Sequence, residues 1–207
     1  MLIDFANLSP AQKYHLMIQS IIPRPIAWIL TRNENKSFNL APFSYFNAVC
    51  SEPPLVMTSI GYKKNGEKKD TRRNIERTAE YVVHIASSEH AQPLTDSAAE
   101  FPSEESEVTA LGLQLDQCFG VDRLPRLLIS RVALYCRLYE IQEIGPRKQG
   151  LIFGEIVAAY YADAVVQGSA KQSGQRLTVD AQKVDPLGRL GGDDYTTFGE
   201  IVTIRRD

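Results

Sequence analysis

The sequence predicts a mainly β protein, a β-barrel with helices at its periphery. Several runs are rich in Val, Ile, Tyr and Phe and are bounded by Gly, Pro or Asn, as strands are. The late, long runs are joined by a short turn at Gly145-Pro146, which indicates antiparallel pairing rather than strand–helix–strand units. Closing such strands into a barrel removes the exposed edges that an open sheet would leave.

The first expected element is a helix. Ser9-Pro10-Ala11-Gln12 has the pattern of a capped helix start, and this helix should run to about Gln19 and end before Pro23. Two further helices are expected at Asp70–Thr78 and Glu89–Glu100. The predicted strands are Ile26–Thr31, Leu40–Phe46, Leu55–Ile60, Tyr81–Ala86, Val132–Ile144, Leu151–Tyr161 and Tyr195–Ile204.

Two segments show neither pattern, Phe101–Glu107 and Gln167–Arg176. The second is the expected mobile surface loop, because it is rich in Gly, Ser and Lys. A chain of 207 residues is long enough for one substantial core, and nothing in it requires a second domain. We therefore expect a single domain over residues 1–207, with residues 1–22 as an N-terminal helical extension.

The composition excludes several classes of protein. Apolar residues make up 43% and charged residues 23%, values typical of a globular protein in water. The net charge of −2 argues against binding to nucleic acid. No run of about 18 apolar residues is present, so no membrane span is expected. The N-terminus lacks a signal-peptide pattern, which favours a cytoplasmic protein.

The residues that usually bind metals or perform catalysis form no familiar pattern. The three cysteines are far apart and predict neither a zinc site nor a disulfide framework, and Cys136 is the expected core residue among them. The three histidines form no metal-binding motif, so no metal is expected. No catalytic residue can be assigned. A chain poor in catalytic side chains indicates a cofactor that supplies the chemistry itself.

The stretch from Pro23 to Asn47 has the composition of a wall for a flat ring. An apolar run is followed by a polar turn and by a second run in which Phe43 and Tyr45 alternate with Ser44 and then Asn47. Aromatic side chains offer a stacking surface, and the hydroxyl and amide groups offer hydrogen bonds to a heterocycle. The alternative is an ordinary hairpin with one buried face.

A second stretch, Gly61–Arg77, suits a phosphate. It carries seven basic residues against three acidic ones. Lys69-Asp70-Thr71 opens the predicted helix, with Asp70 or Thr71 near its N-cap. Free backbone N–H groups, the Lys69 charge and the Thr71 hydroxyl would all favour a terminal phosphate. The alternative is a capped, solvated surface helix.

Five motifs follow one another in order between Pro23 and Arg205. They are Arg24-Pro25-Ile26-Ala27-Trp28, Asn39-Leu40-Ala41-Pro42-Phe43-Ser44-Tyr45-Phe46-Asn47, Pro53-Pro54, Lys69-Asp70-Thr71-x-x-Asn74-Ile75 and Arg189-Leu190-Gly191-Gly192-x-x-Tyr195. In this order the motifs resemble the flavin reductase-like proteins of the FMN-binding split-barrel group.

The resemblance implies a Greek-key split barrel, a homodimer with FMN near the subunit interface, and reduction of flavin by NAD(P)H. By position, residues 39–47 would line the isoalloxazine ring, residues 59–61 would approach the ribityl chain or ring edge, and residues 69–71 would bind the phosphate. A cation such as Arg24 would favour the charge that grows on the reduced ring. The residues expected to bind the cofactor are Arg24, Ala41, Pro42, Phe43, Ser44, Tyr45, Asn47, Ser59, Ile60, Gly61, Lys69, Asp70 and Thr71.

Two residues near these motifs have two interpretations. Trp28 would shape the pocket wall or simply belong to the core, and Arg189 would lie near the ligand or form a structural ion pair.

One position departs from the family pattern. Many members carry a Gly-Asp-His-type motif shortly before a Phe-x-Gly-Glu-Val strand. Here that strand is Leu151–Val157, and the His position is occupied by Gln149. Two functions therefore stay open. The first is an NAD(P)H-dependent flavin reductase that passes electrons to an oxygenase or another acceptor protein. The second is a non-catalytic FMN carrier or electron-transfer flavoprotein that a partner protein reduces.

Overall fold

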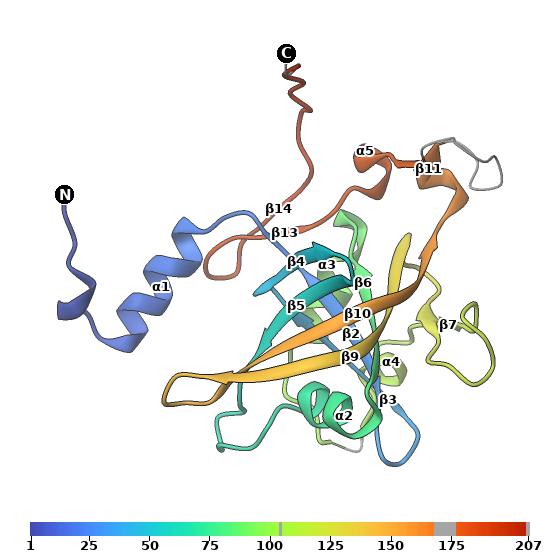
Figure 1. The fold of residues 1–207 in the computed structure, drawn as a ribbon, viewed down its shortest axis with the longest axis horizontal. Helices are drawn as coiled ribbons and strands as arrows, with labels where there is room; N and C mark the ends of the chain where they lie inside the picture. The colour runs from blue at the N-terminus through green and yellow to red at the C-terminus, as the bar shows by residue number, and fades with distance from the viewer. Residues whose placement is uncertain (104, 168–176, 206–207) are drawn as a thin grey trace.

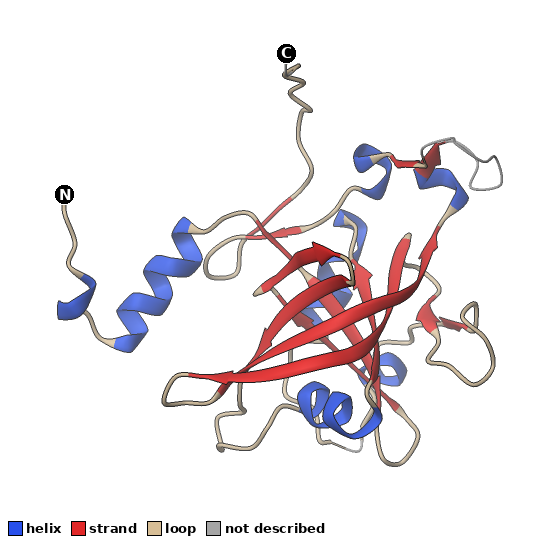
Figure 2. Cartoon of the chain, in the orientation of Figure 1, coloured by secondary structure: helices blue, strands red, loops and turns tan. Residues whose placement is uncertain are grey.

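The computed structural model describes residues 1–103, 105–167 and 177–205. It confirms a mainly β architecture, in which one large antiparallel sheet curls around the core and the helices lie at its periphery (Figures 1 and 2). Most of the loop predicted at 167–176 lies outside the described residues, which resume at Leu177. Helix α1 (Pro10–Ser20) stands to one side of the barrel, and the C-terminal tail leaves it at the top of the view (Figure 1).

The large sheet has seven strands in the order β3-β2-β6-β9-β10-β5-β4, and every neighbouring pair is antiparallel. The strands are β2 (Ala27–Arg32), β3 (Phe38–Phe43), β4 (Phe46–Ser51), β5 (Pro54–Ile60), β6 (Glu80–Ile85), β9 (Val132–Ile144) and β10 (Gln149–Tyr161). Strands β3 and β4 are the two edges, yet only Ser44 and Tyr45 separate them in the chain. The two edges therefore meet at this link without pairing along their length, which gives a split barrel in Greek-key order.

The smaller elements surround this sheet. The other helices are α2 (Asp70–Thr78), α3 (Ala91–Asp96), α4 (Glu107–Ala110) and α5 (Ala181–Val184), with 3-10 turns at Phe5–Asn7, Ser88–His90 and Asp163–Val165. Strands β1 (Arg24–Pro25), β13 (Gly188–Arg189) and β14 (Tyr195–Thr196) form a small sheet that joins the two ends of the chain. The remaining pairs are β7 (Leu115–Asp116) with β8 (Arg126–Leu127), and β11 (Val166–Gln167) with β12 (Thr178–Val179).

Several sequence predictions are confirmed at the level of single residues. Helix α2 and strand β9 have the predicted bounds. Helix α1 begins with a capping box, in which the Gln12 N–H donates to Ser9 Oγ (3.3 Å) and the Ser9 N–H donates to Gln12 Oε1 (2.9 Å). Residues 101–106 form no helix or strand among those described, and Glu107 already belongs to α4.

Three predicted elements are wrong in extent. The strand predicted at 40–46 is broken at Ser44, because the chain crosses there from one edge of the sheet to the other. The helix predicted at 89–100 consists of a 3-10 turn and α3, which ends at Asp96. Directly after this end, the Ser97 hydroxyl donates to the Leu94 carbonyl and accepts a hydrogen bond from the Trp28 indole. The strand predicted at 195–204 pairs only over Tyr195–Thr196, and the tail beyond has no strand partner among the described residues.

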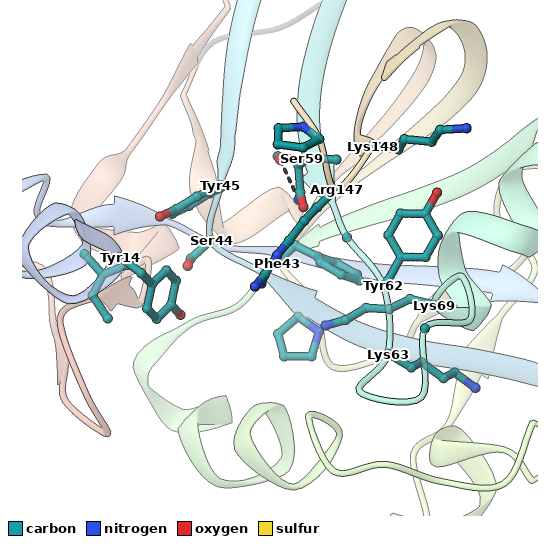
Figure 3. Close-up of a pocket in the computed structure, with 16 residues that line it drawn as sticks. Tyr14, Phe43, Ser44, Tyr45, Ser59, Tyr62, Lys63, Lys69, Arg147 and Lys148 are labelled. Carbon is teal, nitrogen blue, oxygen red and sulfur yellow. Dashed lines mark hydrogen bonds between the residues drawn. The ribbon is translucent and has the colours of Figure 1, made fainter. Parts of the chain in front are cut away.

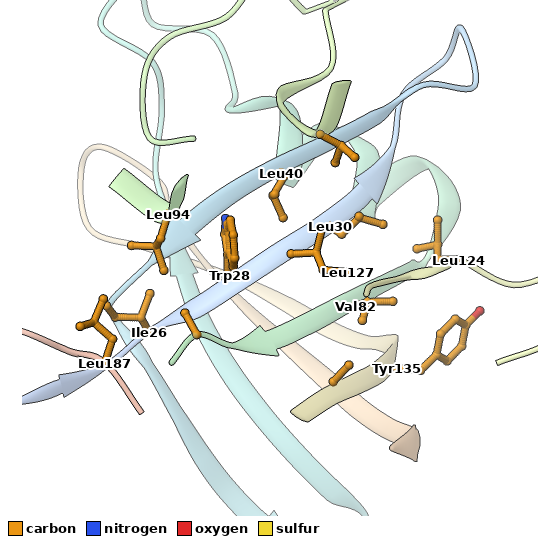
Figure 4. Packing of buried hydrophobic residues seen from close by; sticks show 13 residues of the cluster. Ile26, Trp28, Leu30, Leu40, Val82, Leu94, Leu124, Leu127, Tyr135 and Leu187 are labelled. Carbon is orange, nitrogen blue, oxygen red and sulfur yellow. The ribbon is translucent and has the colours of Figure 1, made fainter. Parts of the chain in front are cut away.

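The core lies on both faces of the central strands. On β2, Trp28 and Leu30 point into one cluster of buried side chains (Figure 4), whereas Ala27 and Ile29 point into another. The alternation of side chains along a strand explains this division, and burial on both faces explains why the run is apolar throughout. Trp28 is fully buried and its Nε1–H donates to Ser97 Oγ (2.9 Å), so the core interpretation of Trp28 is confirmed. Cys136 is likewise fully buried.

The edge strand β3 is covered by side chains from α4 and its N-cap. The Ser106 hydroxyl donates to the Phe38 carbonyl (2.5 Å), and the Leu40 N–H donates to Glu107 Oε2 (2.9 Å). Burial raises the pKa of the Glu107 carboxyl. These bonds occupy backbone groups that would otherwise pair with a strand from another molecule.

His84 is a structural histidine on β6. It is fully buried, and the Leu127 N–H donates to its Nε2 (2.9 Å). The proton therefore sits on Nδ1, which donates to the Trp28 carbonyl (3.0 Å). Burial, with a further contribution from Arg126, lowers the pKa of His84 to about 4.

We expect stability to fall in mild acid because of His84. In the folded protein the pKa of His84 lies below the ordinary value of about 6.5. Its contribution to the free energy of unfolding is therefore complete above pH 6.5 and is lost as the pH falls toward 4. The loss should be about 3 kcal/mol between pH 7 and pH 4. Urea unfolding at a series of pH values measures it. The His84→Gln variant should be less stable but show a shallower slope, whereas His15→Gln, at an exposed position, should keep the native slope. Equal slopes in all three proteins would contradict the assignment.

Candidate functional site

Two adjoining cavities open beside the link between β3 and β4. The first has a volume of about 780 Å³ and the second about 640 Å³. They share Phe43, Tyr62, Lys63 and Lys69 in their walls, so they form one continuous depression. The first cavity is bordered by α1, β5 and the turn between β9 and β10 (Figure 3), and the second extends past the N-terminus of α2 toward residues 97–103.

One wall of the first cavity is the link between the two edge strands. Pro42, Phe43, Ser44 and Tyr45 line it, and Tyr14 of α1 lies nearby (Figure 3). Ser44 Oγ accepts a hydrogen bond from Arg24 Nε (3.4 Å). Burial raises the pKa of the Tyr45 hydroxyl, so this group stays protonated at neutral pH. The wall combines flat apolar surface with hydroxyl groups.

The opposite wall is built from β5 and the start of β10. Gln149 Nε2 donates to Ser59 Oγ (2.9 Å), which holds the Gln149 side chain against β5. A Cβ at position 61 would lie 2.7 Å from Gln149 Oε1, so Gly61 leaves the room that this amide uses. Gln149, at the position where the resemblance places a histidine, thus lines the cavity with an amide that carries no titratable proton.

The N-terminus of α2 lies where the two cavities join. Lys69 is its N-cap residue, and no side chain caps the helix among the described residues. Burial lowers the pKa of Lys69, an effect that Glu100 partly offsets. Its Nζ lies 5.4 Å from the centre of the Phe43 ring. Uncapped backbone N–H groups and a partly desolvated ammonium group therefore face the same space, an arrangement that favours an anion.

The neighbours of Lys69 have other partners. The Asp70 carboxylate forms ion pairs with Lys63 (2.6 Å) and Arg73 (2.5 Å). Thr71 is 1% exposed, and its Oγ1 accepts a hydrogen bond from Asn39 Nδ2 (2.9 Å). Thr71 thus joins a buried polar network beneath the helix instead of presenting its hydroxyl to solvent. In the same network, Asn74 Nδ2 donates to Asn33 Oδ1 (2.8 Å) and to Thr31 Oγ1 (3.1 Å).

Arg72 fastens α2 to the turn between β9 and β10. Its guanidinium pairs with Glu76 (3.0 Å) on its own helix and with Glu143 (2.5 Å) on β9. It also donates to the Lys148 carbonyl (3.1 Å). A Cβ at Gly150 would lie 2.9 Å from this guanidinium, so the glycine admits it.

The structure brings most of the predicted site residues to this depression. The first cavity is lined by Pro42, Phe43, Ser44, Tyr45, Ser59, Gly61 and Lys69, and the second adds Ala41, Asp70 and Thr71.

Three predicted residues line neither cavity. Arg24 is buried and donates to the carbonyls of Ile18, Ile21 and Leu190 as well as to Ser44. Ile60 is fully buried in the core, because successive residues of β5 face opposite sides. Asn47 is exposed on β4, and its Oδ1 accepts from the Ala48 N–H.

Arg189 fits neither of its two interpretations completely. In the part of the chain that the structure describes it forms no ion pair; it donates to the Gly192 carbonyl and lies 4.4 Å from the centre of the Tyr195 ring. It also lines a small cavity of about 140 Å³ together with Pro42, Phe43 and Ser44.

Sequence reasoning missed four residues that line the first cavity. Tyr14, Tyr62, Arg147 and Lys148 line the first cavity but were not predicted. Residues 146–149 reach β5 only through the pairing of β10 with β5, in which Gly150 lies opposite Ile60. A signal was nevertheless present, since two adjacent basic residues stand immediately before Gln149.

Within the described ranges, no group of three or more His, Cys, Asp or Glu side chains is placed to hold a metal ion. No helix of the described residues has the length and apolar character needed to span a membrane.

The open barrel and the site beside its two edge strands can now be compared with known proteins. The family described as "Flavin reductase like domain" matches residues 19–174, and the chain belongs to this family. The order of motifs in the sequence had indicated the same family. Membership ties the function of this protein to flavin.

Three solved structures show how far the similarity extends. Nitrilotriacetate monooxygenase component B from Bacillus cereus is 29% identical, with 99% of this chain and 98% of that chain covered and a TM-score of 0.87. The 2-nitrobenzoate 2-nitroreductase NbaA from Pseudomonas fluorescens is 30% identical, with 100% of this chain and 96% of that chain covered and a TM-score of 0.84. A split-barrel protein from Shewanella frigidimarina shares the fold at 21% identity and a TM-score of 0.81, with 100% of both chains covered.

Proposed function

We propose that the protein binds FMN in the two adjoining cavities and catalyses reduction of this flavin by NAD(P)H. The observation that carries the proposal is the position of Lys69, a partly buried cation at an uncapped helix N-terminus where the cavities join. A terminal phosphate would satisfy both the ammonium group and the free N–H groups. The network of Asn39, Thr71 and Asn74 holds the helix in place for it.

The first cavity suits the ring of the flavin. Phe43 and Tyr45 offer aromatic surface on one side, while Ser44, Ser59 and Gln149 offer hydrogen bonds at its borders. Bound flavin supplies the chemistry by accepting a hydride at N5. The task of the chain is to hold donor and acceptor rings in contact and to exclude water, which requires no nucleophilic side chain.

A second candidate is a carrier of FMN that a partner protein reduces. Gln149 favours it, because an amide cannot deliver a proton at the position where many family members have histidine. Between the two, family membership supports the reductase, and the names of the similar proteins suggest two kinds of acceptor. These are an oxygenase partner, or a small oxidised aromatic compound reduced at the same site.

An anaerobic visible spectrum of the protein loaded with FMN tests these alternatives. Flavin that bleaches promptly with NADH or NADPH supports the reductase. Flavin that stays yellow until dithionite is added favours the carrier, and Gln149→His should then be tested for gain of turnover. Absence of bound flavin would contradict both.

We further propose that the protein is a homodimer with flavin near the subunit interface. Helix α1 lies at one side of the barrel (Figure 1), and Met17 (41% exposed) and the C-cap residue Ile21 (60%) leave apolar side chains in water. The tail after β14 does the same, with Ile201, Val202 and Ile204 exposed. A second copy would bury these side chains, which a lone chain leaves in water.

Charges on α1 should therefore separate the subunits. We expect the native protein to sediment as a dimer at micromolar concentration and the double variant Met17→Asp, Ile21→Asp to sediment as a monomer, because each carboxylate would be desolvated in the interface. Val121→Asp, at an exposed position between β7 and β8, is the matched control and should stay dimeric. Analytical ultracentrifugation measures this, and a monomeric native protein would contradict the proposal.

A further inference from the structure

The turn between β9 and β10 places a free cation at the first cavity. The strands end at Ile144 and start again at Gln149, and the Lys148 N–H bonds to the Gly145 carbonyl (3.0 Å) to close the turn. From this turn the Arg147 side chain reaches across the cavity toward Phe43, whereas the Lys148 side chain points the other way (Figure 3). Within the described chain, the Arg147 guanidinium has no hydrogen bond and no ion pair.

Arg147 adds a positive charge to the first cavity that no side chain of the described residues neutralises. Four basic residues line this cavity and no acidic residue does. Lys63 is neutralised by Asp70 (2.6 Å), and Lys69 stands at the end of α2. A single phosphate at the α2 N-terminus would occupy Lys69 but not Arg147, which borders only the first cavity. A second anionic group that enters the first cavity would find Arg147 without another partner.

We propose that Arg147 binds a phosphate group of the incoming nicotinamide nucleotide, an inference that rests on the proposed function. The planar guanidinium presents paired N–H donors that match phosphate oxygens, which a lysine cannot do. The turn itself is firmly placed, because Arg72 holds the Lys148 carbonyl and Glu143 while it stays bound to α2. Arg147 thus extends from a fixed base over the site where the donor must enter.

The nucleotide offers two sources of phosphate, the diphosphate of both donors and the 2′-phosphate of NADPH alone. The experiment is anaerobic stopped-flow reduction of the FMN-loaded protein over a range of NADH and of NADPH concentrations, for the native chain, Arg147→Gln and Arg137→Gln. We expect Arg147→Gln to raise the half-saturating nucleotide concentration by about tenfold or more, as loss of a charge-assisted bond does. The limiting reduction rate and the dissociation constant of FMN should change less than about threefold, which is the usual size of the effect of a surface substitution.

The two variants and two donors separate the outcomes. If Arg147→Gln binds both nucleotides more weakly, Arg147 contacts the diphosphate. If only NADPH binds more weakly, Arg147 contacts the 2′-phosphate. Arg137→Gln removes the same charge at an exposed position of β9 that lines neither cavity, and it should behave as the native protein. If both donors reduce the native protein and Arg147→Gln has the same half-saturating nucleotide concentrations, the inference is wrong and the proposed function still holds. Weakened FMN binding in Arg147→Gln also overturns it, because the guanidinium would then serve the flavin. Native protein that neither donor reduces overturns both.

Discussion

Replacing Lys69 with Ala should weaken FMN binding by about 10- to 100-fold, the cost of one charge-assisted phosphate contact. Lys69 is the N-cap residue of α2 and lines both cavities. Its partial burial means that water screens the interaction less than at an exposed site. Quenching of FMN fluorescence on titration with protein measures the dissociation constant.

Lys68→Ala is the matched control for this substitution. Lys68 is the adjacent residue, but it pairs with Glu76 (2.7 Å) and lines neither cavity. Its removal should leave the affinity for FMN within about threefold of the native value, as expected for a surface pair. Equal affinities in the native protein and in Lys69→Ala would show that the phosphate lies elsewhere.

Gly154→Ala should destabilise the barrel by about 3 kcal/mol or more, the upper range for overpacking of a core. A Cβ at position 154 would lie 1.8 Å from Tyr81 Oη and 2.7 Å from Tyr81 Cζ. Tyr81 is fully buried on β6, so its ring cannot move aside without displacing neighbours. The clash falls beside the register shift between Phe153 and Gly154, where β10 runs irregularly along β9. Urea unfolding followed by circular dichroism measures the loss.

Two further variants isolate the cause. Gly199→Ala is the control, since a Cβ there meets no atom within 4 Å, and it should leave the midpoint of unfolding unchanged. Tyr81→Phe removes a buried hydroxyl that has no hydrogen-bond partner among the described residues, so alone it should cost little. Combined with Gly154→Ala it should recover part of the lost stability, because the nearest clashing atom is gone. A native midpoint in Gly154→Ala would contradict the packing argument.

The sequence predicted the elements whose signals are local. The Ser9 capping box and the helix at 70–78 each depend on a few adjacent residues, and both are confirmed. The break at Ser44 and Tyr45 could not be predicted, because every residue around it is compatible with a strand and only the meeting of the two sheet edges interrupts it. The tail at 197–204 has strand-like composition but no partner strand among the described residues, and pairing rather than composition makes a strand.

The candidate site shows the same difference between residues with a local signal and residues placed by long-range pairing. The chain near Phe43 and Lys69 supplied both an aromatic pattern and a helix start, so one wall was predictable. Arg147 and Gln149 reach the same space through strand pairing with residues about 90 positions earlier, which depends on register that no local pattern specifies. Thr71 lines the second cavity, where the sequence predicted a phosphate, but its hydrogen bond to Asn39 depends on a contact between α2 and β3 that only the fold provides.

The polar network beneath α2 has a consequence for how tightly a ligand can be held. Asn39, Thr71 and Asn74 bond to one another or to Thr31 and Asn33, all of them groups of the protein. These bonds fix the start of α2 independently of any anion, so little conformational entropy should be lost there on association. The affinity of this position for an anion should therefore depend on charge and geometry. Added salt should weaken anion binding more than substitutions that change the flexibility of the chain elsewhere.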